Sequence, residues 1–302
     1  MNTPDSPAMS NRLSPGKPRR LVSALLSLGA PGLGHAVIGF WRRAAVWFLA
    51  GLVPIILLYL AVLVSAPRLM WLAMGMVVLV RIVATLDAVR LPRCRGLPRP
   101  RIILVLLVAL AAVQQGGAVW LRADVVEAYA IPANSMYPTL ESGDRVLVAK
   151  TPASFERGDV VTFRYPLDQS VRYVKRIVGV GGDSVAIRDG LLVVNGRVLD
   201  RSKTEDSCNE EDGDQGCAIW RERLDGRSHR IAIDGEAIRD NLSVQRVPAG
   251  HVFLLGDARG RSRDSRVFGP VPNRLLEGKV RFVWWSSGVH GIRFSTINQL
   301  VE

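Results

Sequence analysis

Residues 171–180 read VRYVKRIVGV, a run rich in β-branched side chains that is typical of a β-strand. Lysine occurs at only five positions of the chain, and one of them, Lys175, lies in the middle of this run. Strand alternation places Tyr173, Lys175 and Ile177 on one face. If that face is buried, loss of hydration lowers the pKa of the ammonium and leaves a neutral amine that can accept a proton.

Short apolar runs with turn residues between them continue on both sides of this stretch. Asn195-Gly196 separates two of them and is the typical signal of a two-residue hairpin. No long amphipathic helix is predicted after residue 121, so we predict a mainly antiparallel all-β domain over 122–302. The polar, acidic segment 201–245 has a weak strand signal and is interpreted as an insertion or a subdomain. The other predicted strands are 126–131, 145–149, 159–165, 184–188, 191–194, 230–233, 252–255 and 280–285.

The first third of the chain has a different composition. Residues 44–66 and 102–121 are uncharged apolar runs, each long enough to cross a bilayer. Residues 69–89 are apolar except for Arg81 and Asp87, which lie six residues apart and therefore on different faces of a helix. We predict an α-helical membrane region over 21–121, preceded by a tail at 1–20.

Charge follows the same division. The 302 residues carry a net charge of +12 and are 48% apolar, which excludes a mainly disordered chain. Such a basic chain is often a nucleic-acid binder. Here residues 1–121 contribute +11 and residues 122–302 only +1, so the excess belongs to the membrane region. We predict no nucleic-acid partner.

The positive-inside rule orients the membrane region. Residues 90–101 contain five arginines and are expected to stay in the cytoplasm, with the tail at 1–20. The chain after residue 121 is then outside, and we predict a multi-pass protein of the inner membrane with a periplasmic β domain. Segment 21–40 has basic flanks on both sides and a Gly- and Pro-rich centre, so it is either re-entrant or a span of its own.

Several kinds of chemistry have no support in the sequence. There is no HExxH motif, no histidine cluster with metal spacing, no GxSxG elbow and no phosphate-binding loop. No metal and no cofactor are therefore predicted. Cys208 and Cys217 lie outside the cytoplasm on the predicted topology and are candidates for a disulfide.

Four motifs carry a specific resemblance. Residues 131–140 read IPANSMYPTL and resemble the nucleophile motif of type I signal peptidases, the bacterial leader peptidases. RGDVV at 157–161, YVKRIVG at 173–179 and GDARGRSRDSR at 256–266 resemble the next three motifs of that family, in the same order. The resemblance spans about 130–272, and it implies the β fold shared by signal peptidases and SOS repressors.

The resemblance implies a membrane-bound serine endopeptidase that removes N-terminal signal peptides from exported pre-proteins. Ser135 would be the nucleophile and its backbone N–H an oxyanion donor, while Lys175 would be the general base. Ser262 would hydrogen-bond the lysine. Asp264 and Arg266 would form a salt bridge that supports the last motif. Asp257 and Arg259 would also help to hold this motif in place.

Departures from the family pattern leave an alternative open. Ala133 stands where many members carry an oxyanion hydroxyl, and Ala258 and Gly260 replace residues that are commonly Asn and Asp. The alternative is a catalytically impaired homologue that acts as a membrane-anchored accessory in secretion or pilus assembly. The self-cleaving SOS repressors share the dyad, but the predicted spans argue against them. Besides pre-proteins, the expected partners are the lipid bilayer and, as an open candidate, the secretion translocon.

Overall fold

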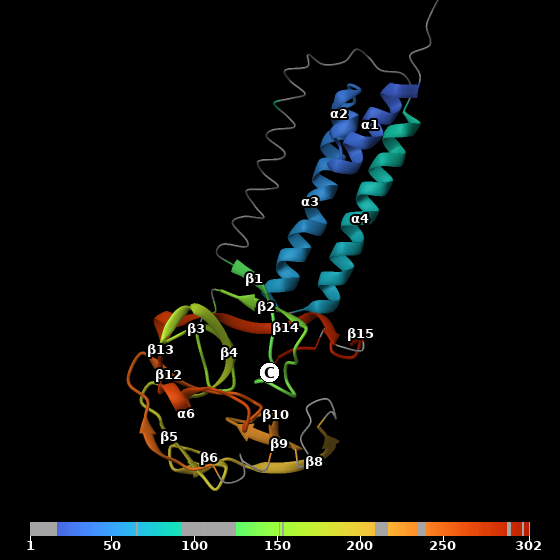
Figure 1. Ribbon diagram of the computed structural model, residues 1–302. Helices are drawn as coiled ribbons and strands as arrows, with labels where there is room; N and C mark the ends of the chain where they lie inside the picture. Colours follow the sequence, from blue (N-terminus) through green and yellow to red (C-terminus); the bar gives the residue numbers. More distant parts are fainter. Residues whose placement is uncertain are drawn as a thin grey trace, which may run out of the picture. The chain divides into compact units, whose positions relative to one another are not determined.

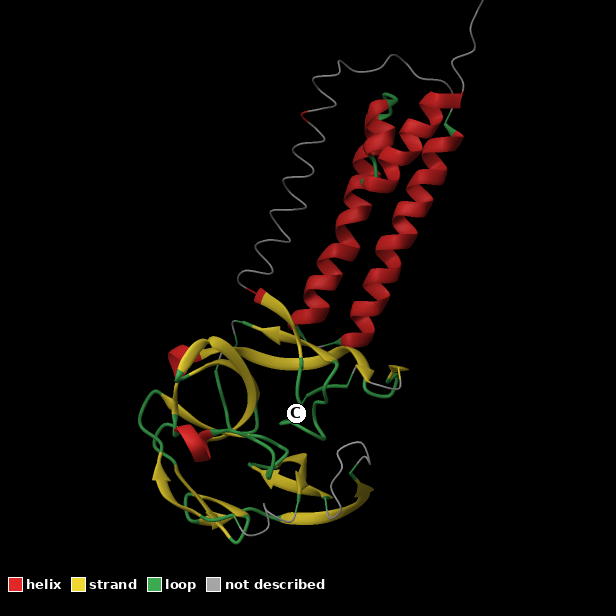
Figure 2. Cartoon of the chain, viewed as in Figure 1, coloured by secondary structure: helices red, strands yellow, loops and turns green. Residues whose placement is uncertain are grey.

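The computed structural model describes residues 17–64, 66–91, 105, 125–150, 152, 154–208, 217–234, 240–288, 291–297 and 299–301. The chain divides into a helical unit within residues 1–117 and a β unit that contains residues 118–302 (Figures 1 and 2). Apart from residue 105, the predicted span 102–121 lies outside the described residues. So do residues 1–16 of the tail.

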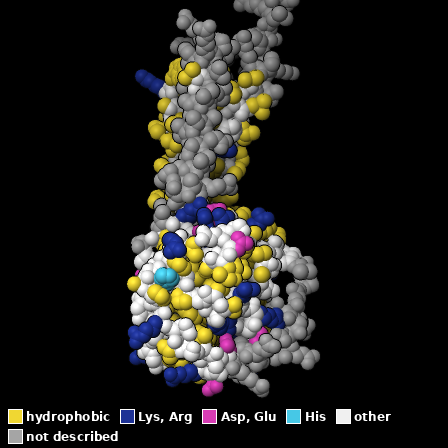
Figure 3. Space-filling view, turned by 60° about the vertical axis from the view of Figure 1, so that its left-hand side comes forward, with side chains coloured by type: hydrophobic (Ala, Val, Ile, Leu, Met, Phe, Trp, Pro, Cys, Tyr) yellow, Lys and Arg dark blue, Asp and Glu magenta, His cyan; other side chains and the backbone are white. Residues whose placement is uncertain are grey.

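The helical unit contains two long apolar helices, α3 (Trp41–Leu63) and α4 (Pro67–Arg90). Both are long and apolar enough to cross a membrane. Figure 3 shows hydrophobic side chains gathered along the helices. The two helices coincide with the predicted runs 44–66 and 69–89. Asp87 accepts a hydrogen bond from Arg43 rather than from Arg81, as the different helix faces of Arg81 and Asp87 indicate.

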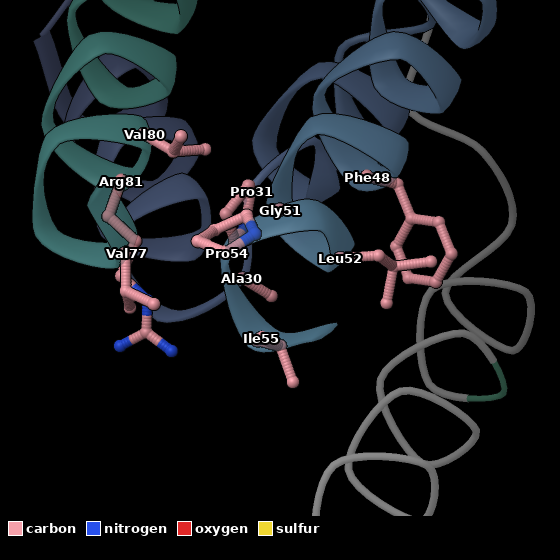
Figure 4. A pocket seen from close by; sticks show the side chains of 10 residues that line it. All are labelled: Ala30, Pro31, Phe48, Gly51, Leu52, Pro54, Ile55, Val77, Val80 and Arg81. Carbon is pink, nitrogen blue, oxygen red and sulfur yellow. The ribbon is translucent and has the colours of Figure 1, made fainter. Parts of the chain in front are cut away.

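The segment 21–40 is a helical hairpin rather than one continuous helix. Helix α1 (Lys17–Gly29) ends before a turn at residues 30–32, and the short α2 (Leu33–Val37) follows. The Ser23 hydroxyl donates to the Gly34 carbonyl at 3.2 Å and ties the two helices together. Figure 4 shows Pro31 of the turn beside Gly51 of α3, at a small, mainly apolar pocket of about 40 Å³. The proline in the turn is the physical reason for the break.

The β unit is built on an antiparallel eight-stranded sheet, as predicted. Its strand order is β1-β2-β14-β3-β4-β12-β13, and β15 pairs with β14. The strands are β1 (Val126–Ala130), β2 (Asp144–Ala149), β3 (Val160–Tyr165), β4 (Asp168–Val180), β12 (His251–Leu255), β13 (Val271–Pro272), β14 (Leu276–Gly288) and β15 (Gly291–Ile292).

Two smaller antiparallel sheets complete the unit. One has the order β11-β5-β6-β7 and the other β10-β9-β8. In the turn between β6 and β7, Asn195 and Gly196 both have positive φ, which confirms the predicted hairpin. Helical residues in the described part of this unit are confined to α6 (Ser265–Phe268), a 3₁₀ turn η4 (Asn273–Leu275) and one residue before β1. The strands are β5 (Ser184–Arg188), β6 (Leu191–Val194), β7 (Arg197–Val198), β8 (Arg201–Ser207), β9 (Ala218–Leu224), β10 (Arg227–Ile233) and β11 (Leu242–Arg246).

The segment 201–245 contains more strand than its weak signal indicates, and it does not pair only within itself. The segment contains β8, β9 and β10, and its last strand, β11, pairs with β5 outside it. The alternation of apolar and polar residues is weak in β9 and β10, because one buried position of each strand holds a polar side chain, Glu222 and His229. Cys208 and Cys217 in this segment form a disulfide with a Cα–Cα distance of 5.8 Å.

Candidate active site

Ser135 lies in the loop between β1 and β2. The loop is closed at its base by backbone hydrogen bonds from Ile131 to Asp144 at 2.8 Å and from Gly143 to Ile131 at 2.9 Å. Met136 and Leu140 are fully buried in the apolar core beneath it. Because core packing anchors the loop next to the serine, the half-buried Ser135 side chain is held in place by its neighbours.

Lys175 reaches this loop from the middle of β4. Its ammonium nitrogen Nζ donates to Ser135 Oγ at 2.7 Å and to the Val174 carbonyl at 2.9 Å. The ring of Tyr173 lies on the same side, with its centre 5.5 Å from Nζ. Lys175 is only 3% exposed. The strand face that carries it is therefore buried, which is the condition for a lowered pKa.

The surroundings of Lys175 favour its neutral form. Burial lowers the pKa of Lys175 to about 8, because the ammonium loses hydration; Asp264 and Asp257 partly oppose this shift and Arg266 adds to it. No carboxylate of the described residues lies within ion-pair distance of Nζ. At pH 7, about one lysine in ten is then a neutral amine beside a hydroxyl.

Arg176, the next residue, points into a separate ion-pair network. It is fully buried and donates twice to Asp257, at 2.9 and 2.7 Å, and to the Gly158 carbonyl at 2.7 Å. Burial would raise the pKa of Asp257, but the guanidinium of Arg176 holds it below its usual range. Thr139, from the nucleophile motif, also donates to Asp257. One ion pair thus connects all four motifs.

The roles of Arg176 and Thr139 were missed by sequence reasoning. Both lie inside quoted motifs, so their positions were visible. Arg176 lies in the middle of a strand, on the face opposite Lys175. This position could have indicated a buried cation that needs a carboxylate partner.

Asp264 and Arg266 form the ion pair that the resemblance implied. Arg266 donates to the two carboxylate oxygens of Asp264 at 2.8 Å each, and to Asp240 at 2.8 Å. Asp264 also accepts the backbone N–H of Gly256 at 2.9 Å and that of Arg266 at the start of α6. The carboxylate therefore fixes both ends of the turn that carries Ser262.

Ser262 differs from its expected role. Its hydroxyl is buried but makes no hydrogen bond among the described residues, so the implied bond to Lys175 is not formed. The lysine instead donates to Ser135 and to the Val174 carbonyl. Ser262 packs against Gly256, where a Cβ would overlap both the Ser262 hydroxyl and the Ser135 carbonyl oxygen. A glycine is therefore required at 256 for the last motif to approach the nucleophile loop.

Arg259 joins the last motif to the β8–β10 sheet. It donates to the buried Glu222 carboxylate at 3.0 Å, and His229 Nε2 lies 3.3 Å from the same carboxylate. Burial alone would raise the pKa of Glu222, but Arg259 and His229 lower it to about 2. The backbone of Ala232 bonds to Asp257 and Arg259 at 2.9 Å each. Sequence reasoning missed Glu222 and His229, because nothing local shows that a polar strand residue is buried.

The neighbourhood of Ala133 contains one backbone donor suited to a developing oxyanion. Ala133 is exposed, and in the described part of the chain the Ser135 N–H donates no hydrogen bond to another group. The Asn134 side-chain oxygen accepts the N–H of Ser142 at 2.7 Å. The described residues hold no group of three side chains that could bind a metal ion.

Comparisons with known proteins identify the family of this chain. The model of the family described as signal peptidase, peptidase S26, matches residues 100–285. Signal peptidase I of Pseudomonas aeruginosa is 36% identical over 194 residues, which cover 55% of this chain and 67% of that protein. The Aquifex aeolicus signal peptidase I is 30% identical over 240 residues, covering 67% of this chain and 90% of that protein.

A crystal structure of a signal peptidase I from Enterococcus faecalis also matches, at 30% identity and a TM-score of 0.26. The matched region covers 42% of this chain and 96% of the Enterococcus faecalis chain. The family assignment rests on the sequence matches, since the family model alone covers more than half of the chain. This chain belongs to the signal peptidase family, peptidase S26.

Proposed function

We propose that this protein removes N-terminal signal peptides from pre-proteins, with Ser135 as nucleophile and Lys175 as general base. The observation that carries the proposal is the 2.7 Å contact between Lys175 Nζ and Ser135 Oγ in a buried site. A hydroxyl is a weak nucleophile at neutral pH and needs an adjacent base. A lysine whose pKa is lowered to about 8 can be that base.

The reaction then runs in two steps. The neutral amine of Lys175 takes the Ser135 proton as Oγ attacks the scissile carbonyl carbon, and the Ser135 N–H donates to the oxyanion that forms. The lysine ammonium returns the proton to the leaving amine when the peptide bond breaks. The same lysine takes a proton from a water molecule as its oxygen attacks the ester carbonyl, and it returns that proton to Ser135 Oγ when the ester bond breaks and the new C-terminus is released.

The ion pairs around the dyad act as positioning groups in this proposal. Arg176 and Asp257 tie the strand of the lysine to the last motif, and both bond to Thr139 of the serine loop. Asp264 and Arg266 hold the turn at Gly256, whose close approach brings the last motif onto the Ser135 carbonyl. Neither pair touches the reacting atoms, so both act through geometry and through their charge on the pKa of Lys175.

A narrow pocket lies beside the nucleophile loop. It measures about 10 Å³, and its lining includes Tyr137, Ala232 and Ala258. An extended substrate could add to a sheet edge and place alternate side chains in such shallow pockets. The resemblance implies small residues at positions −1 and −3, and a Phe at −1 should therefore block cleavage of a pre-protein.

We also propose a multi-pass protein of the inner membrane with its β unit on the periplasmic side. The distribution of arginines around the apolar segments supports this orientation. The disulfide between Cys208 and Cys217 is compatible with an oxidising compartment. Labelling of single-cysteine variants by a membrane-impermeant reagent in whole cells would test this orientation. The cysteine of Lys203→Cys should react, and Cys94 should not.

The accessory alternative has no finding in its favour. To test the dyad, the purified full-length protein is incubated with a pre-protein and compared with Ser135→Ala and Lys175→Ala. Ser228→Ala and Lys203→Ala are matched controls, because both side chains are exposed on the β8–β10 sheet. We expect cleavage by the wild type and both controls only. Cleavage that persists in either dyad variant would contradict the mechanism, and an inactive wild type would favour the accessory role.

A further inference from the structure

The helical unit contains a second charged site that the peptidase mechanism does not use. A cavity of about 500 Å³ lies between one end of α3 and the end of α4. Three arginines line it, Arg42, Arg43 and Arg90, together with Trp47, Asp87 and aliphatic side chains of both helices. The lining therefore combines guanidinium groups with an apolar wall, at the end of two helices that can cross a membrane.

The charges in this cavity do not balance. Asp87 is the only acidic residue between residues 6 and 123. Its carboxylate is already engaged by Arg43 at 3.2 Å, by the Trp47 indole N–H at 2.9 Å and by His35 Nε2 at 3.0 Å. Among the described residues, the Asp87 carboxylate therefore pairs with one of the three guanidinium groups, that of Arg43. Arg42 and Arg90 also line the cavity, and residues 6–123 contain no second acidic residue that could pair with them.

We propose that this cavity binds the phosphate headgroup of an anionic phospholipid. Guanidinium groups form paired hydrogen bonds with phosphate oxygens. The aliphatic side chains beside them suit the start of the acyl chains, which a free phosphate would leave uncovered. Basic pockets between membrane helices at the cytoplasmic side bind such headgroups, and Trp residues gather at the same depth. The same arginines that orient the protein in the membrane would then also hold a lipid.

Native mass spectrometry of the full-length protein in a neutral detergent would test this site. Phosphatidylglycerol and phosphatidylcholine with the same acyl chains are titrated separately. The variants are Arg42→Gln with Arg90→Gln, and the matched control is Arg68→Gln with Arg81→Gln, which removes the same charge elsewhere on α4. Each arginine near an anionic lipid contributes about fivefold in affinity, so the first double variant should bind phosphatidylglycerol roughly 25-fold more weakly. The control should bind it as the wild type does.

Three results would overturn the proposal. Equal binding of the two lipids would show that the arginines do not select an anion. An equal loss in the control variant would show a general effect of net charge rather than a site. Displacement of the lipid by an equal concentration of inorganic phosphate would assign the cavity to a free anion. Circular dichroism of each variant confirms that a loss of binding is not a loss of fold.

Discussion

Lys175 and Arg176 are neighbours on β4, equally buried and both basic, yet they meet opposite surroundings. Lys175 faces a hydroxyl and a carbonyl, with no carboxylate in contact, and its pKa is lowered to about 8. Arg176 faces the carboxylate of Asp257 and forms a two-bond ion pair with it. Burial lowers the pKa of the Lys175 amine, which has no carboxylate in contact among the described residues, whereas the buried guanidinium of Arg176 is compensated by the Asp257 carboxylate.

The largest effect is expected when Lys175 is replaced by arginine, the residue type of its neighbour Arg176. Lys175→Arg keeps the positive charge, but a guanidinium stays protonated and cannot act as a base. We expect kcat for pre-protein cleavage to fall roughly 10⁴-fold or more, as for the loss of other catalytic bases. Lys203→Arg on β8 is the control and should keep full activity. Activity within tenfold of the wild type would show that Lys175 is not the base.

Removing the compensated cation should cost stability. Arg176→Gln leaves the Asp257 carboxylate buried without a counter-charge, and the free energy of unfolding should fall by about 3–5 kcal/mol. Denaturant unfolding in detergent, followed by tryptophan fluorescence, measures it. Arg164→Gln, which breaks an exposed pair with Glu277, should cost less than about 1 kcal/mol.

A double variant sharpens that measurement. Arg176→Met combined with Asp257→Leu removes both charges and should recover most of the lost stability, because no uncompensated ion remains. If the double variant is as unstable as Arg176→Gln, the loss comes from the hydrogen bonds of Arg176 to Gly158 and Thr139 rather than from the charge.

The lowered pKa of Lys175 predicts the pH dependence of catalysis. The base must be neutral, and its neutral fraction rises as the pH approaches the pKa of about 8 from below. We expect kcat/KM to increase about tenfold per pH unit below that value and to level off above it. Steady-state cleavage of a peptide substrate between pH 6 and 9.5 measures this. A profile that is flat or falls between pH 6 and 8 would contradict a lysine base.

The smallest expected effect concerns Ser262. Its hydroxyl has no hydrogen-bond partner among the described residues, so Ser262→Ala removes no bond to Lys175. A side-chain hydrogen bond is worth about 1 kcal/mol, and we expect kcat to fall by less than about tenfold. A loss of more than 100-fold in single-turnover cleavage would show that Ser262 orients the lysine during the reaction.

Much of the fold could be predicted from the sequence because its signals are local. Strand alternation and turn residues identified six of the eight strands of the main sheet but not the short β13 and β15, and uncharged apolar runs identified α3 and α4. The four motifs located Ser135 and Lys175 by their order along the chain. Local patterns were insufficient for β8 and β9, where polar side chains occupy buried positions.

Local patterns along the chain were thus enough to predict the two-part organisation, the all-β class and the residues of the candidate dyad. Only the tertiary structure decided which charges meet. Arg176 and Asp257 are 81 residues apart, and Arg259 and Glu222 are 37 apart. It also decided that the Ser262 hydroxyl makes no hydrogen bond to another described residue and that segment 21–40 folds into a hairpin. The physical reason is that periodicity and turn chemistry act over a few residues, whereas the partner of a buried charge depends on how distant strands pack.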